Sequence, residues 1–206
     1  MHISDGILPL PVLIGGALTT LGGTVIGLKR LSAEKIPQTA LFTAALFLAS
    51  LVHIPLGPTS VHLVLNGVAG LILGWLIFPA FLVALFLQAI LFQFGGLTTL
   101  GINTLNMALG GVVAYGLFGL LVRRSKGRLL QISAALASAV AIAVTGTLVA
   151  LELASTGEAF YPAAKLVLIA HLPIMGVEAL ISAILVDFLK RAKPEIFQLS
   201  ATGVKG

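Results

Sequence analysis

The chain contains no cysteine and few charged residues. None of its 206 residues is cysteine, which excludes disulfides and thiolate metal sites. A transition metal would have to bind through nitrogen, oxygen or methionine sulfur. Charged residues make up 9% of the chain, whereas soluble domains carry roughly a quarter. So few charges cannot cover the surface of a soluble protein of this length. This excludes a soluble enzyme, a DNA-binding domain and a disordered chain.

Hydrophobic residues are abundant and occur in long runs. They make up 58% of the chain, and its mean hydropathy is +1.12. A membrane-spanning helix needs about 20 predominantly apolar residues. The uncharged run 61–94 is too long for one crossing, and Gly74, Trp75 and Pro79 interrupt it. The sequence predicts an all-α integral membrane protein, a single domain over 1–206 with about seven transmembrane helices, at about 7–28, 37–55, 61–77, 79–94, 103–122, 129–153 and 163–189.

The basic residues predict the orientation of these helices. Eleven of the twelve lysines and arginines fall in three clusters, within residues 29–35, 123–128 and 190–205. Lysine and arginine concentrate on cytoplasmic loops. The three clusters share one side of the membrane only if the run 61–94 crosses twice. We therefore expect a multi-pass protein of the inner (cytoplasmic) membrane, with its amino terminus outside and its carboxy terminus in the cytoplasm.

Four histidines lie at or near the predicted outer ends of the spans, and the position of His2 is the most unusual. Met1 is expected to be retained because the residue after it is large. The amine of Met1, the amide nitrogen of His2 and the His2 imidazole can then form two adjoining chelate rings. Ni(II) and Cu(II) favour such planar sets of nitrogens. His62 lies on the same predicted face and can supply a fourth nitrogen.

Other interpretations of these residues are open. A histidine at position two is often accidental, and a histidine at a helix end often serves only as an interfacial hydrogen-bonding group. His53 is a rival ligand, and His171 precedes a proline within the last span. Glu152 and Glu178 lie in predicted spans, where a carboxylate usually faces the bundle interior or a partner. Each is either a structural buried acid or a functional one. Glu152 could draw cations, and Glu178 could gate the metal site or contact another subunit.

Three stretches carry a resemblance to a known family: MHISDG at 1–6, GPTSVHL at 57–63 and FQFGGLTTLGINTLNM at 92–107. Together with AHLP at 170–173 and KPEIF at 193–197, they make the chain similar to the CbiM/NikM family. These proteins are the substrate-binding S components of energy-coupling factor (ECF) transporters for cobalt and nickel. The likeness covers nearly the whole chain. Family members often carry an acidic residue before the Gly-Gly pair, where this chain has Gln93-Phe94.

The resemblance implies a seven-helix protein whose amino-terminal segment, residues 1–6, folds into the body. There Met1, His2 and His62 would bind the metal ion through four nitrogens. It also implies a transmembrane coupling subunit, two cytosolic ATPase subunits and a small auxiliary membrane protein as partners. Because ligating imidazoles are normally held by further hydrogen bonds, we expect a supporting set of polar residues around them: Asp5, Thr59, Ser60, Asn103 and Asn106.

The leading hypothesis is a subunit that captures nickel or cobalt as a transported substrate, with nickel slightly favoured by the planar nitrogen set. The sequence has no ATP-binding P-loop and no catalytic arrangement, so we expect neither an enzyme nor an organic cofactor. One alternative is a self-sufficient metal permease or channel, which should have more polar helices. Another is a membrane scaffold, which would not need the Met-His start.

Overall fold

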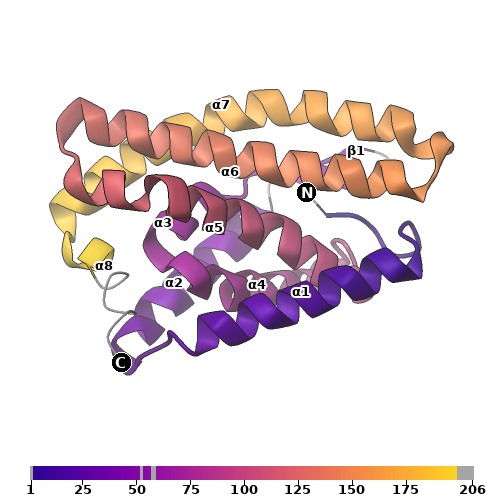
Figure 1. Cartoon of the computed structure of the whole chain (residues 1–206), viewed down its shortest axis with the longest axis horizontal. Helices are drawn as coiled ribbons and strands as arrows, with labels where there is room; N and C mark the ends of the chain where they lie inside the picture. Colours follow the sequence, from indigo (N-terminus) through magenta and orange to yellow (C-terminus); the bar gives the residue numbers. More distant parts are fainter. Residues whose placement is uncertain (1, 52, 57–58, 199–206) are drawn as a thin grey trace.

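The computed structural model describes residues 2–51, 53–56 and 59–198, and its long helices form one bundle (Figure 1). Antiparallel strands β1 (His53–Leu56) and β2 (Thr59–His62) form a small hairpin. Single-turn 3-10 helices η1 (Ala33–Lys35), η2 (Gly74–Leu76) and η3 (Glu158–Phe160) precede α2, α4 and α7. The helices, in chain order, are α1 (Leu10–Leu28), α2 (Ile36–Ala49), α3 (Asn66–Leu73), α4 (Ile77–Phe92), α5 (Leu100–Arg124), α6 (Gly127–Thr156), α7 (Tyr161–Ala192) and α8 (Glu195–Gln198).

The helices have the length and surface of membrane-spanning segments. Many large apolar side chains point outward, such as Leu18, which is 64% exposed. Apolar surface of this kind is unfavourable in water but is solvated by lipid chains. The expected all-α membrane protein is confirmed, with the hairpin as its one described β element. Within the described residues, five helical stretches are long and apolar enough to cross a membrane: Leu10–Leu28, Asn66–Phe92, Leu100–Arg124, Gly127–Thr156 and Glu158–Ala192.

The uncharged run 61–94 does not begin as a helix. The segment expected to be helical over 61–77 is extended up to His62, because β2 pairs with β1 there. α3 starts only at Asn66. Gly74 ends α3 with a φ of +57°, a backbone conformation that glycine adopts without strain. The chain then turns through η2 into α4, within the interruption that Gly74, Trp75 and Pro79 indicated.

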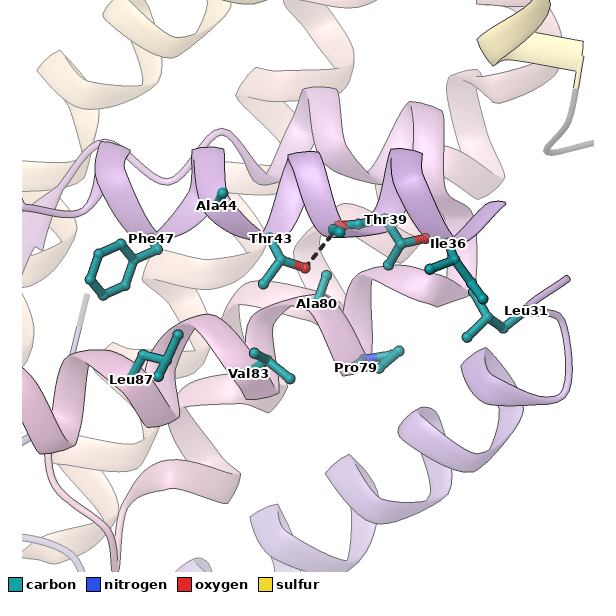
Figure 2. A pocket seen from close by; sticks show the side chains of 11 residues that line it. Leu31, Ile36, Thr39, Thr43, Ala44, Phe47, Pro79, Ala80, Val83 and Leu87 are labelled. Atoms are coloured by element: carbon teal, nitrogen blue, oxygen red, sulfur yellow. Dashed lines mark hydrogen bonds between the residues drawn. The ribbon is translucent and has the colours of Figure 1, made fainter. Parts of the chain in front are cut away.

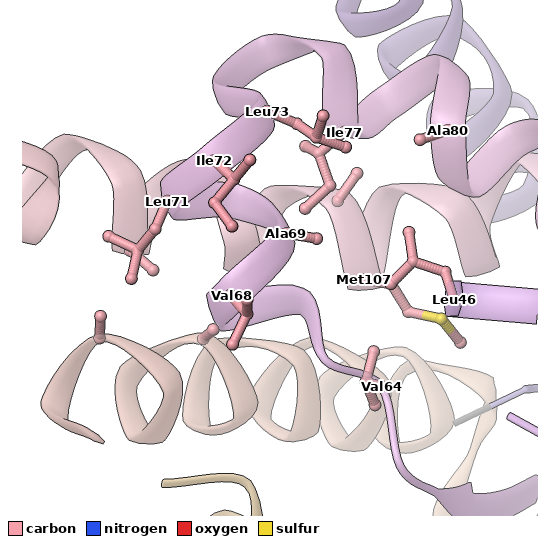
Figure 3. Close-up of a cluster of buried hydrophobic side chains, with 14 of the residues drawn as sticks. Leu46, Val64, Val68, Ala69, Leu71, Ile72, Leu73, Ile77, Ala80 and Met107 are labelled. Carbon is pink, nitrogen blue, oxygen red and sulfur yellow. The ribbon is translucent and has the colours of Figure 1, made fainter. Parts of the chain in front are cut away.

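α3 lies at the centre of the hydrophobic core, and all eight of its residues are buried. Figure 3 shows its side chains, among them Val68 and Ile72, gathered with Ile77 of α4 and Met107 of α5. A Cβ on Gly70 would collide with the carbonyl of Gly111 in α5. Glycine therefore lets the backbones of α3 and α5 approach closely, as in other helix pairs packed within a membrane.

The loops gather at two ends of the bundle. The carboxyl ends of α1, α5 and α7 lie together at the left of Figure 1, and the turn between α6 and α7 lies at the opposite end. The basic residues at 29–35, 123–128 and 190–193 follow or end those three helices. They therefore share one end of the molecule. β1 lies toward the other end, as does the start of the chain.

Candidate metal centre

Residues 2–6 form an amino-terminal strap that docks against β2 and α5 and turns at Asp5 and Gly6. Ile3 makes an isolated antiparallel bridge with Thr59 of β2, whose hydroxyl donates to the carbonyl of His2 at 2.9 Å. The side chain of Asn103 in α5 accepts from the N–H of Ile3 at 2.9 Å and donates to its carbonyl at 3.0 Å. One amide therefore pairs with both backbone groups of Ile3, which fixes the register of the strap.

Asp5 anchors the other end of the strap to the start of α5. Its Oδ1 accepts from the backbone N–H groups of Thr98 at 3.2 Å and Thr99 at 3.3 Å, and from the hydroxyl of Thr98 at 2.5 Å. N–H groups at a helix start have no partner within the helix, and a carboxylate there is favoured by the helix dipole. Gly96 lies so close to this carboxylate that a Cβ would overlap it. A distant aspartate thus binds the turn that leads into α5 and ties down the strap.

The imidazoles of His2 and His62 lie together at the strap. Their ring centroids are 4.7 Å apart, with the ring planes inclined by 32°. Both residues are buried, with exposed fractions of 4% and 3%. A metal ion binds an imidazole nitrogen at about 2 Å. Two rings at this separation are therefore close enough to share one ion.

Each of the two rings has one nitrogen committed to a hydrogen bond. Nε2 of His2 donates to Oε1 of Gln88 in α4 at 2.8 Å, and Nδ1 of His62 donates to the carbonyl of Leu63 at 2.8 Å. A neutral imidazole carries its proton on the donating nitrogen and a lone pair on the other. The lone pairs therefore reside on Nδ1 of His2 and Nε2 of His62. Nδ1 is also the His2 nitrogen that can form a chelate ring with the amide nitrogen of the same residue.

The structure brings most of the expected supporting residues to the strap. Thr59, Asn103 and Asp5 hold it as described, and the backbone N–H of Ser60 donates to the His2 carbonyl at 3.3 Å. Asn106 has a different partner, since its amide donates to the carboxylate of Glu152 at 2.6 Å. Met1 and the side chain of His53 lie outside the described residues. The backbone of His53 pairs with that of His62 in the hairpin.

Gln88 is a site residue that the sequence interpretation missed. It is 1% exposed within α4, and its one signal in the sequence is that it is the single amide in the apolar segment 77–92. The Nδ1 of His171 bonds within its own helix, because it donates to the Val167 carbonyl one turn earlier in α7. Among the described residues, no group of three histidine, aspartate or glutamate side chains could hold a metal ion.

A separate groove of about 450 Å³ lies between α2 and α4, and Figure 2 shows its lining. The hydroxyl of Thr43 donates to the Thr39 carbonyl at 2.8 Å, within the same helix. The described lining contains neither histidine nor carboxylate, so this groove has no metal-binding chemistry. The lining residues are Leu31, Ile36, Thr39, Ala40, Thr43, Ala44, Phe47, Pro79, Ala80, Val83 and Leu87.

Comparison with known proteins agrees with the chemistry of the two histidines. The chain is 40% identical over 200 residues to a Haemophilus influenzae protein named for metal transport, a match that covers 95% of this chain and 96% of that protein. It is 32% identical over 220 residues to the fused nickel transport protein NikMN of Rhodobacter capsulatus, covering 95% of this chain and 63% of that longer protein. The crystal structure of a transition metal transporter has the same fold, with a TM-score of 0.81 at 23% identity and 100% of both chains covered.

A further match is to a family rather than to a single protein. Residues 2–196 match the CbiM family, described as the cobalt uptake substrate-specific transmembrane region. This range contains the strap from His2 onward, the hairpin that bears His62 and every long helix. The chain therefore belongs to the CbiM family of metal-uptake membrane proteins.

Proposed function

We propose that the chain is the substrate-capture subunit of an ATP-driven ECF-type transporter that imports nickel or cobalt. The observation that carries this proposal is the pair of buried imidazoles, His2 and His62, whose centroids are 4.7 Å apart. The strap, residues 2–6, holds His2 beside His62. Membership of the CbiM family supports a divalent transition metal ion as the transported substrate.

The proposed ligands are four nitrogens from three residues. The amine of Met1, the amide nitrogen of His2 and its Nδ1 form a connected chelate, and Nε2 of His62 supplies the fourth nitrogen. Ni(II) rewards a planar set of nitrogens, which favours nickel slightly over cobalt. Cu(II) would bind even more tightly by the Irving–Williams order. Selection between ions in the cell then depends on which metals are available and delivered.

The proposed topology has seven crossings, with the amino terminus outside and the carboxy terminus in the cytoplasm. It is supported by the three basic clusters at one end of the bundle, because lysine and arginine favour the cytoplasmic side. The run 61–94 then crosses twice, first through residues 61–73, which include α3, and then through α4. In the inner membrane, this places residues 1–6 on the outer face, where an incoming ion is captured.

The energy for import is proposed to come from other subunits. The chain has no P-loop, so two cytosolic ATPase subunits would act through a transmembrane coupling subunit, together with a small auxiliary membrane protein. The match to NikMN supports a multi-component transporter, because that fused protein is longer than this chain. No step requires an organic cofactor or catalysis by this chain itself.

Metal binding by the purified full-length protein tests the site. The protein should bind one Ni(II) or Co(II) ion, and His2→Ala and His62→Ala should each abolish this binding without loss of the fold. The control is His53→Ala, because His53 is the nearest alternative imidazole in sequence. Unchanged nickel and cobalt affinity in both His2→Ala and His62→Ala would refute the proposed site.

Uptake measurements in cells distinguish the proposed function from its alternatives. Metal accumulation should require the ATPase subunits as well as this chain. Accumulation driven by this chain alone would instead establish a self-sufficient permease or channel. A scaffold without a transport role would bind no metal in the purified state.

A further inference from the structure

Glu178 is a fully buried carboxylate in the middle of α7, with an exposed fraction of 0%. Its Oε1 accepts hydrogen bonds from the backbone N–H groups of Val64 at 2.5 Å and Leu65 at 2.8 Å. An ionisable side chain within a membrane-spanning helix is costly and usually has a function or a specific partner. Here the partner is the backbone of a short link that is more than a hundred residues away in sequence.

This link, residues 63–65, joins the end of β2 to the start of α3. Leu65 has a φ of +54°, in the left-handed region that is unfavourable for residues other than glycine. No side chain of the link caps α3. Unpaired N–H groups at a buried helix start are unfavourable. The carboxylate of Glu178 therefore supplies the acceptor that this backbone conformation needs.

The link also controls the neighbouring imidazole. His62 is the residue immediately before it, and Nδ1 of His62 donates to the carbonyl of Leu63 within it. The backbone position of His62 and the hydrogen bond that orients its ring thus both depend on the link. A movement of the link would shift His62 relative to His2, whose ring centroid is 4.7 Å away.

We propose that Glu178 is a positioning residue for metal binding. By holding the N–H groups of Val64 and Leu65, it fixes the link so that His62 presents Nε2 to the ion. Glu178 acts only through His62 and does not touch the metal. This inference rests on the proposed function, and it extends the metal centre to α7, a helix far from the strap in sequence.

Two substitutions separate the hydrogen-bond acceptor from the volume of the side chain. Glu178→Gln keeps an oxygen that can accept both N–H groups, so nickel affinity should stay within about threefold of the wild-type value. Glu178→Met has similar volume but no such acceptor, and nickel affinity should fall about 10- to 100-fold, as for other residues that orient metal ligands. The control is Ser182→Ala, which alters a buried polar residue one turn along α7 and should leave affinity unchanged.

Copper(II) makes a double-mutant cycle possible, because its higher affinity for nitrogen ligands keeps binding measurable without His62. In the wild-type background, Glu178→Met should weaken copper binding and shift the electron paramagnetic resonance spectrum toward that of His62→Ala. In the His62→Ala background, Glu178→Met should have no further effect. A general structural role would instead give additive losses.

The outcomes distinguish this inference from the proposed function. If the wild-type protein binds no metal, or if His62→Ala binds nickel as tightly as wild type, the proposed function fails. If those results are as proposed, three outcomes overturn this inference alone. The first is that the losses of copper affinity in the double-mutant cycle are additive. The others are wild-type nickel affinity in Glu178→Met and equal losses of nickel affinity in Glu178→Gln and Glu178→Met. If Glu178→Met does not fold, Glu178→Asp retains a carboxyl group but draws the acceptor away from the link. It should then show a partial loss of affinity and a partial spectral shift, and wild-type values would overturn the inference.

Discussion

Nε2 of His2 donates a hydrogen bond to the side-chain oxygen of Gln88 at 2.8 Å, although 86 residues separate the two in sequence. This bond orients the imidazole and keeps the proton on Nε2. The lone pair is then on Nδ1, the nitrogen that can chelate a metal together with the backbone amide. Gln88, a buried residue of α4, therefore determines which nitrogen of His2 carries the lone pair.

Replacing Gln88 by leucine should lower the affinity for nickel about 10- to 100-fold, because the imidazole would lose the bond that fixes its tautomer and orientation. Gln88→Glu keeps an acceptor and makes the ring more basic, so it should bind at least as tightly as wild type. The matched control is Gln93→Asn, an exposed glutamine just after the same helix. Isothermal titration of nickel would check these values, and wild-type affinity in Gln88→Leu would contradict the assigned role.

Removing the side chain of Asn103 should loosen the strap, because both backbone groups of Ile3 would lose their partner. We expect Asn103→Ala to reduce nickel affinity about tenfold or more. Asn103→Asp retains an acceptor for the N–H of Ile3 but loses the donor, so its affinity should be intermediate. Asn106→Ala is an informative comparison, because that amide bonds to Glu152, and its effect should be smaller. If Asn103→Ala, Asn103→Asp and Asn106→Ala all bind nickel with the same affinity, the docked strap does not depend on Asn103.

A methyl group at position 96 should displace Asp5 from the start of α5. The Cβ of Gly96→Ala would overlap the carboxylate of Asp5, so we expect weaker metal binding and lower thermal stability. Gly157→Ala is the matched control. Gly157 also has a positive φ, of +140°, but a Cβ there would meet no atom within 4 Å. If the two variants lose metal affinity equally, backbone strain rather than contact with Asp5 is the cause.

Residues added before Met1 should destroy metal binding although every side chain remains. The terminal amine would become an amide nitrogen without a basic lone pair, and the chelate would lose one end. A tag at the carboxy terminus should leave binding intact. Binding should also weaken in acid, because the amine, the amide and both imidazoles must release protons to coordinate. Metal stoichiometry of the two tagged forms decides the matter, and full occupancy in both would exclude the amine as a ligand.

The sequence was informative where the pattern of residues along the chain is enough to indicate the structure. Long apolar runs bounded by basic clusters predicted the all-α membrane protein, and Gly74 and Pro79 indicated where the chain turns before α4. His2 and His62 were selected from the chemistry of nitrogen ligands and the predicted face of the membrane. The structure places their rings side by side. Neither inference required knowledge of tertiary contacts.

What the sequence could not predict depends on contacts between distant segments. Hydropathy does not reveal that residues 61–65 are not helical, because those residues belong to the same uncharged apolar run as the helix that follows. Asn103 and Asn106 look equivalent in sequence, yet one faces Ile3 and the other Glu152. Gln88 was passed over because a single amide in an apolar helix has no partner until the fold supplies one.

The docking of the strap has a consequence for the biosynthesis of the protein. His2 bonds to a residue made 86 positions later, and Ile3 to one made 100 positions later. Residues 2 and 3 must therefore remain undocked until the segment through the start of α5 has been synthesised. Such long-range contacts form late in folding. Docking of the strap would then mark the end of assembly of the amino-terminal half, and a chain truncated before α5 could not form these contacts.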